Sequence, residues 1–91
     1  MQSIWKYPIE TTDYQTIEVP TGATLLTVQT QFEEPCIWAL VETTAPKQKR
    51  DIRVHGTGHP IEDASGLRHI GTYQLSDGAL IFHVFEKIQR A

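Results

Sequence analysis

Residues 53–59, RVHGTGH, place two imidazoles, two glycines, a hydroxyl and a guanidinium within seven positions. A glycine-rich turn can direct successive backbone N–H groups at one anion, and hydroxyl and imidazole groups add further donors. Arg53, Arg68 or Lys49 would then neutralise the charge, an arginine through a bidentate fork. The sequence therefore predicts a phosphate-binding loop. Its predicted ligands are His55, Gly56, Thr57, Gly58 and His59.

The same stretch has a simpler interpretation as a connection between two strands. Glycine and Pro60 are common turn formers, and the run before them alternates like a strand. The stretch does not match a P-loop, because the lysine that should follow the second glycine is absent and no helix is predicted after it. Anion binding and a plain turn both stay open.

Metal binding and catalysis have less support in the histidine pattern. His55 and His59 are four residues apart, a spacing that suits two zinc ligands on a helix, but the intervening GTG disfavours a helix. Imidazole titrates near neutral pH, so His55 with His59 or His83 could act as acid and base in a phosphodiesterase. Such enzymes usually place a separate Ser or Thr two residues from each histidine, whereas here Thr57 is the one such neighbour for both His55 and His59. We therefore expect no metal, no cofactor and no catalytic residue.

Basic and aromatic residues outside the loop could complete a nucleotide site, but each has an ordinary structural explanation. The basic run KQKRDIR at residues 47–53 is either an edge strand that discourages aggregation or a rim that steers phosphate toward the loop. Trp5 and Tyr7 could stack on a base, although aromatic residues in a small chain are more often part of the core.

Alternation with a period of two recurs along the chain, whereas no window of a dozen residues keeps a helical period. Seven short strands separated by turn residues predict a single all-β domain over residues 1–91, folded as a small antiparallel β-sandwich or barrel. Residues 36–42, CIWALVE, are apolar on both faces, so we expect a central strand covered on both sides with Trp38 in the core. Gly71, inside another strand, predicts a bulge or a close backbone approach.

Chain length, cysteine usage and charge limit the cellular setting. The single Cys36 cannot form an internal disulfide, and we find neither a secretory leader nor a run of about 18 apolar residues. We therefore expect a cytoplasmic protein that does not contact the membrane. A net charge of −3 argues against bulk nucleic acid binding, and the small core of a 91-residue chain favours a homo-oligomer.

Six blocks of sequence, in order, resemble a family of small phage and prophage proteins that carry a domain of unknown function. The blocks cover nearly the whole chain and are IWKYPIE, DYQTIEVPTGA, LTVQTQ, PCIWALV, HGTGHPI and IGTYQL. The resemblance implies a viral or prophage accessory protein that acts in the bacterial cytoplasm, and it implies no activity and no site residue. Some small β-rich phage proteins block host defence by sequestering nucleotide-derived signals, which is an analogy of size and lifestyle.

We therefore expect a binding protein that sequesters a small phosphorylated or nucleotide ligand in an anti-defence role. Its site would combine the loop at residues 55–59 with Arg53 and Arg68, and Trp5 or Tyr7 would stack on a base. The first alternative is an interaction protein that inhibits a host defence protein by direct contact. The second alternative is the histidine-dependent phosphodiesterase.

Overall fold

The computed structural model of the chain describes residues 1–88, which form seven antiparallel strands. The strands are β1 (Gln2–Pro8), β2 (Tyr14–Pro20), β3 (Thr24–Gln31), β4 (Glu34–Glu42), β5 (Lys47–Gly56), β6 (Leu67–Leu75) and β7 (Leu80–Lys87). The predicted all-β class is confirmed, and the strands form a two-sheet sandwich. The described residues include no helix that is long and apolar enough to cross a membrane.

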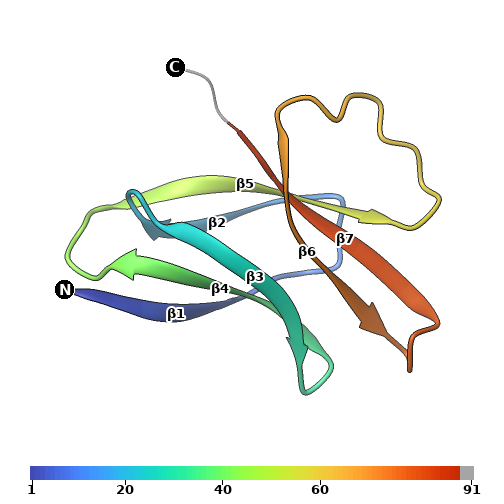
Figure 1. Ribbon diagram of the computed structural model, residues 1–91, viewed down its shortest axis with the longest axis horizontal. Helices are drawn as coiled ribbons and strands as arrows, with labels where there is room; N and C mark the ends of the chain where they lie inside the picture. Colours follow the sequence, from blue (N-terminus) through green and yellow to red (C-terminus); the bar gives the residue numbers. More distant parts are fainter. Residues whose placement is uncertain (89–91) are drawn as a thin grey trace.

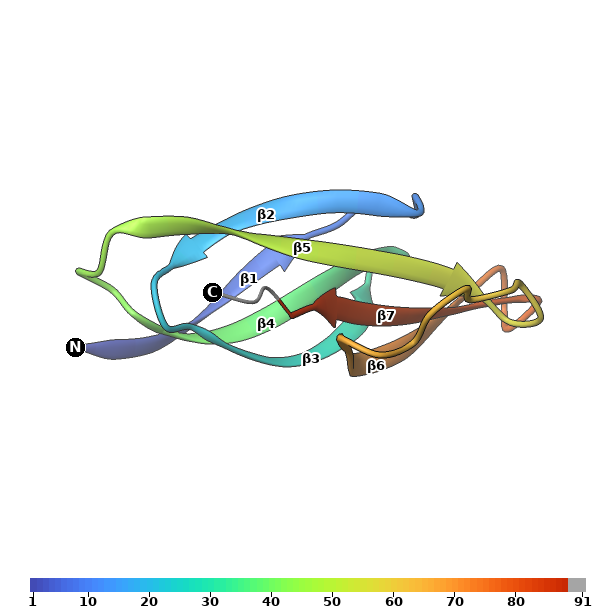
Figure 2. The ribbon, with the colours of Figure 1, turned by 90° about the horizontal axis from the view of Figure 1, so that it is seen from above.

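Two sheets form the layers of the sandwich. One has the strand order β1-β4-β3 and the other has the order β2-β5-β7-β6. Figure 2 shows β2 and β5 above β1 and β4, whereas β6 lies beside β3 in Figure 1. The larger sheet therefore twists, as sheets of L-residues do, from a position over β4 to a position beside β3.

Aliphatic side chains on the inward-facing positions of both sheets fill the core. Val19, Ile52 and Val84 come from the larger sheet, Ile37 and Val41 come from the smaller one, and each is at most 1% exposed. Alternation sends the intervening side chains to the outer faces. Burial of each such side chain stabilises the fold by roughly 1.5–3 kcal/mol.

Gly71 lies where β6 approaches β3. The pairing of β6 with β7 shifts register between His69 and Gly71, which is a β-bulge. A Cβ atom added to Gly71 would lie 2.8 Å from Val28 Cγ1 and 3.3 Å from the backbone nitrogen of Val28. The expectation of a bulge and a close approach at this glycine is confirmed.

The expectation for residues 36–42 is confirmed only in part. β4 is the central strand of its sheet, and Ile37, Ala39 and Val41 are buried against the second sheet. The opposite face of β4 carries Trp38 and Leu40, which are only half-buried, and no strand among residues 1–88 covers it. The prediction that Trp38 lies in the core is wrong, because two stacked sheets cover only one face of each.

Candidate anion-binding site

Two backbone amides of the glycine loop are already hydrogen-bonded within the protein. The amide of Thr57 donates to the carbonyl of Ile81 (3.1 Å), and the amide of His59 donates to the carbonyl of Gly56 (3.1 Å). Gly58, with a φ of 87°, lies between them in a conformation that closes a tight turn. Of the amides predicted to form an anion nest, that of Thr57 thus binds a neighbouring carbonyl, and the loop contains a tight turn that leads out of β5.

His83 lies on the outer face of the larger sheet, and threonine hydroxyls hold both of its ring nitrogens. Its Nε2 atom is 2.7 Å from Thr57 Oγ1, and its Nδ1 atom is 3.0 Å from Thr72 Oγ1. His55 lies directly opposite His83 in the β5–β7 register. Across the described residues, no group of three or more histidine, cysteine or acidic side chains is arranged to hold a metal ion. Thr57 and Thr72 thus hold the imidazole of His83 in place.

Arg53 and His55 line a pocket of about 410 Å³ on the outer face of β5, together with loop residues 60–63. The guanidinium carbon of Arg53 is 4.8 Å from the centroid of the Tyr14 ring, a cation–π contact. Tyr14 is 71% exposed, and Lys87 lines the other side of the pocket. The outer-face pocket therefore offers an aromatic ring beside two cations.

Two carboxylates of the loop, Glu62 and Asp63, balance the charge of the outer-face pocket. Asp63 accepts hydrogen bonds from the hydroxyl (2.7 Å) and the backbone amide (2.9 Å) of Ser65. These bonds lower the pKa of Asp63, and the charge of Lys87 adds to the effect. Since the carboxylates equal the cations in number, this pocket does not favour an anion by charge alone.

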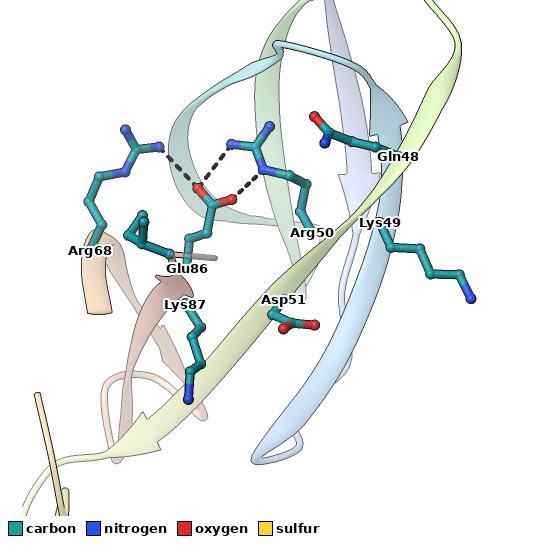
Figure 3. A pocket seen from close by; sticks show the side chains of 8 residues that line it. Gln48, Lys49, Arg50, Asp51, Arg68, Glu86 and Lys87 are labelled. Carbon is teal, nitrogen blue, oxygen red and sulfur yellow. Dashed lines mark hydrogen bonds and ion pairs between the residues drawn. The ribbon is translucent and has the colours of Figure 1, made fainter. Parts of the chain in front are cut away.

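Arg68 lies in a second pocket, where it meets a buried carboxylate. In the β6–β7 register Arg68 is directly opposite Glu86, and its Nη2 atom is 3.2 Å from Glu86 Oε1. Arg50 donates to both oxygens of the same carboxylate, through Nε to Oε2 and through Nη2 to Oε1 (3.0 Å). The third donor of Arg50, Nη1, bonds the carbonyl of Ala23 (2.9 Å). Figure 3 shows the two guanidinium groups converging on one carboxylate.

The three charged side chains of this cluster differ in burial. Glu86 is 6% exposed and Arg50 is 16% exposed, whereas Arg68 is 49% exposed. A buried carboxylate is costly unless it is paired, and Arg50 alone supplies a bidentate pair. Arg68 therefore adds a positive charge that the buried carboxylate does not need.

The end of β7 explains why a pocket opens at this cluster. β7 ends at Lys87, which pairs with Asp51 of β5, whereas β5 begins at Lys47, four residues before Asp51. Within the described residues, positions 47–50 of β5 therefore pair with β2 but not with β7. The result is a notch of about 270 Å³, which we call the basic pocket. Its lining residues are Gln48, Lys49, Arg50, Asp51, Arg68, Glu86, Lys87 and Ile88.

The basic pocket has the charge and the donors to hold an anion. Four cationic side chains and two carboxylates line it. Arg68 uses one of its five N–H donors on Glu86, so the others are directed elsewhere. Lys49 and Lys87 extend away from Glu86 at the rim, where they add positive potential (Figure 3). The arrangement can therefore bind a phosphate through Arg68 while Arg50 keeps the buried charge neutralised.

Three of the predicted site residues line the two pockets. Arg68 lines the basic pocket, whereas Arg53 and His55 line the outer-face pocket. Lys87 lines both, so the two pockets adjoin at this residue. The residues of the glycine loop, Gly56, Thr57 and His59, line neither of them and border a third, mainly apolar pocket beside β7.

Trp5 and Tyr7 lie on β1 in the smaller sheet, and neither lines the basic pocket or the outer-face pocket. Tyr7 packs against the core, and burial raises the pKa of its hydroxyl. The aromatic residue that lines one of these two pockets is instead Tyr14, in the outer-face pocket. Trp5 and Tyr7, which were predicted to stack on a base, therefore line neither pocket.

Sequence reasoning missed Glu86 and Tyr14. A signal for Glu86 is present, because Phe82 and Val84 occupy inward positions of the last strand and alternation then directs Glu86 inward as well. A carboxylate at an inward position requires a cationic partner. The identity of the arginine partners depends on the order of the strands in the sheet, and periodicity does not give that order.

A family model described as Domain of unknown function (DUF7352) matches residues 1–91. The chain belongs to the DUF7352 family. No curated protein and no solved structure matches this DUF7352 chain. The family assignment confirms the expected domain of unknown function, and it assigns no activity.

Proposed function

We propose that this DUF7352 chain is a binding protein that holds a small phosphorylated or nucleotide ligand in the basic pocket. The observation that carries the proposal is the sharing of one buried carboxylate by two arginines, which leaves the half-exposed Arg68 with surplus charge and donors. Charge-assisted bonds from arginine are the usual means of holding phosphate. The rim cations Lys49 and Lys87 draw the anion toward this position.

The adjoining outer-face pocket extends the proposal to ligands that carry a ring. Lys87 borders both pockets. In the outer-face pocket, the ring of Tyr14 offers a flat surface beside Arg53. A nucleotide would place its phosphate beside Arg68 and its base against Tyr14. His55 lies in the same pocket and would supply a hydrogen bond to such a ligand.

The biological setting is also part of the proposal. The chain is a phage or prophage accessory protein that acts in the bacterial cytoplasm, where it sequesters a nucleotide-derived defence signal. The sequence blocks that resemble phage proteins support this origin. The reduced and buried Cys36 fits a reducing compartment.

The test of this function is a capture-and-release assay. The purified protein is incubated with cyclic dinucleotides and mononucleotides, washed, and heated, and the released compounds are identified by chromatography. A sequestering protein retains one ligand class and returns it intact. Recovery of hydrolysed products would support the histidine-dependent phosphodiesterase instead, and retention of none of the ligands would contradict the proposal.

Arg68→Gln is the variant that tests the site. Arg50 still pairs with Glu86 in this variant, and position 68 is half-exposed, so the fold should be kept, but the surplus charge is removed. We expect affinity for the captured ligand to fall by roughly 10- to 100-fold, the value of a charge-assisted hydrogen bond of about 1.5–3 kcal/mol. Lys47→Ala is the matched control, because Lys47 is a basic residue of β5 that does not line the pocket. Equal losses in both variants would show that only net charge matters.

The interaction protein stays the second candidate because one face of the smaller sheet is apolar and uncovered. Ile4 and Leu26 are largely exposed on this sheet, beside the half-buried Trp38 and Leu40. Exposed apolar patches of this kind usually mark contacts with proteins. Direct binding of a host defence protein by this face would be unaffected by Arg68→Gln.

A further inference from the structure

The β3–β4 hairpin ends in an exposed phenylalanine that the backbone does not favour. Only Phe32 and Glu33 connect Gln31 of β3 to Glu34 of β4, and their φ angles are 51° and 66°. Turns of this kind are normally built from Asn and Gly, because other residues are strained at positive φ. Phe32 is also 93% exposed. The hairpin thus presents a large apolar side chain at a cost in both backbone strain and hydration.

A groove lies on the same sheet, on the outer face of β3 and β4. It has a volume of about 350 Å³ and is lined by Thr27, Gln29, Thr30, Gln31 and Trp38. The half-buried indole of Trp38 forms its apolar part. A phenyl ring is small enough to enter this groove and would pack against the indole, an arrangement that aromatic pairs favour.

The charges beside the phenylalanine and beside the groove are opposite. Glu33 and Glu34 adjoin Phe32, whereas Lys6 lies directly opposite Trp38 in the β1–β4 register. The ammonium group of Lys6 is 2.6 Å from Gln31 Oε1, which holds it at the side of the groove. A copy of the hairpin that approached the groove would therefore bring carboxylates to an ammonium group.

We infer that the outer face of the smaller sheet binds a second copy of this chain, with Phe32 of each copy in the Trp38 groove of the other. The smaller sheet carries both the groove and, at the tip of its β3–β4 hairpin, the inserted residue, with complementary charges beside them, as a twofold interface requires. The homo-oligomer that the short chain length leads us to expect would form through this interface. It uses no residue of the basic pocket, so it stands apart from the proposed function.

The size of the face sets the expected strength of the dimer. Three strands about 4.8 Å apart, each offering about seven residues at 3.3 Å, give a flat area of roughly 300 Å² per copy, well below the roughly 800 Å² per partner of standard complexes. The hairpin tips add to this area. We therefore expect a reversible dimer that dissociates on dilution.

Sedimentation velocity over a range of protein concentrations tests the inference. The natural chain should pass from monomer to dimer as concentration rises. Phe32→Asn should remain monomeric over the same range, while its melting temperature stays equal or rises because Asn tolerates positive φ. Leu80→Asn, which changes an exposed apolar residue at the start of β7, should dimerise like the natural chain. A natural chain that is monomeric throughout, or a Phe32→Asn variant that dimerises equally well, would overturn the inference.

A charge exchange tests the predicted pairing across the interface. Glu33→Lys alone and Lys6→Glu alone should each weaken dimerisation by at least about fivefold, because each places like charges together. The double variant should recover most of the loss. If the double variant were as weak as the sum of both single changes, Glu33 and Lys6 would not meet and the proposed arrangement would be wrong.

Discussion

Glu86 places a carboxylate in the interior, and its two arginine partners have different structural roles. Arg50 is largely buried, clamps the carboxylate with two donors and donates to the carbonyl of Ala23 in the connection between β2 and β3. Arg68 is half-exposed and touches a single oxygen. The first partner neutralises a charge that would otherwise be costly to bury, and the second leaves a positive group at the mouth of the notch.

Replacement of Glu86 separates these two effects. Glu86→Gln removes the negative charge but keeps the shape, so two guanidinium groups face each other without a counter-ion. We expect a loss of about 2 kcal/mol in the free energy of unfolding, because Arg50 stays buried while Arg68 can turn toward water. Sulfate should restore part of this loss by binding in the basic pocket beside the two guanidinium groups. Urea unfolding with sulfate and with chloride at matched ionic strength measures both quantities, and equal stability in the two salts would contradict the account.

Among single residues, the sequence pointed to Arg68, Arg53 and His55 as members of a site; Arg68 lines the basic pocket, and Arg53 and His55 line the outer-face pocket. The sequence could not show that these residues divide between two pockets. That division depends on the face of the strand that each residue occupies and on the strand that lies beside it. For the glycine loop, composition allowed an anion nest or a turn. The hydrogen bonds of Thr57 and His59 within the protein favour the turn, and they depend on neighbours that composition does not give.

At the scale of elements, the close contact of β6 with β3 depends on a missing side chain. Gly71→Ala would bring a methyl group to within 2.8 Å of Val28 Cγ1 and near the backbone of β3. We expect a destabilisation of roughly 1–3 kcal/mol, the usual cost of overpacking. Chemical unfolding of Gly71→Ala in the natural and in a Val28→Ala background forms a double-mutant cycle. A cost that is the same in both backgrounds would show that the Val28 side chain is not the obstacle.

Strand existence could be predicted well because alternation and turn residues are local properties of the chain. The bulge at Gly71 follows from the same local logic, since a glycine inside a strand usually marks a close approach. The environment of β4 was less predictable. Its sequence is apolar on both faces, yet no strand of the described residues covers the second face. The pattern of a strand shows which side chains could be buried, but it does not show whether another element is present to cover them.

At the scale of the whole molecule, local charge and net charge have opposite signs. The chain carries a net charge of −3, yet four cationic side chains gather at the notch where β7 ends. This notch belongs to the larger sheet, and the Trp38 groove and Phe32 belong to the smaller sheet. Assembly through one sheet would leave the basic pocket on the other sheet open, so Phe32→Asn should leave ligand affinity unchanged.

The most direct test of the central claim, that Arg68 presents a phosphate-binding position, needs no knowledge of the natural ligand. The melting temperatures of the natural chain and of Arg68→Gln are measured in pyrophosphate and in potassium chloride of equal ionic strength. We predict that pyrophosphate stabilises the natural chain by several degrees relative to chloride, because a ligand that binds only the folded state raises its stability, and that this difference is lost in Arg68→Gln. If pyrophosphate and chloride gave the natural chain the same melting temperature, or if Arg68→Gln kept the full difference, the basic pocket would not be an anion site.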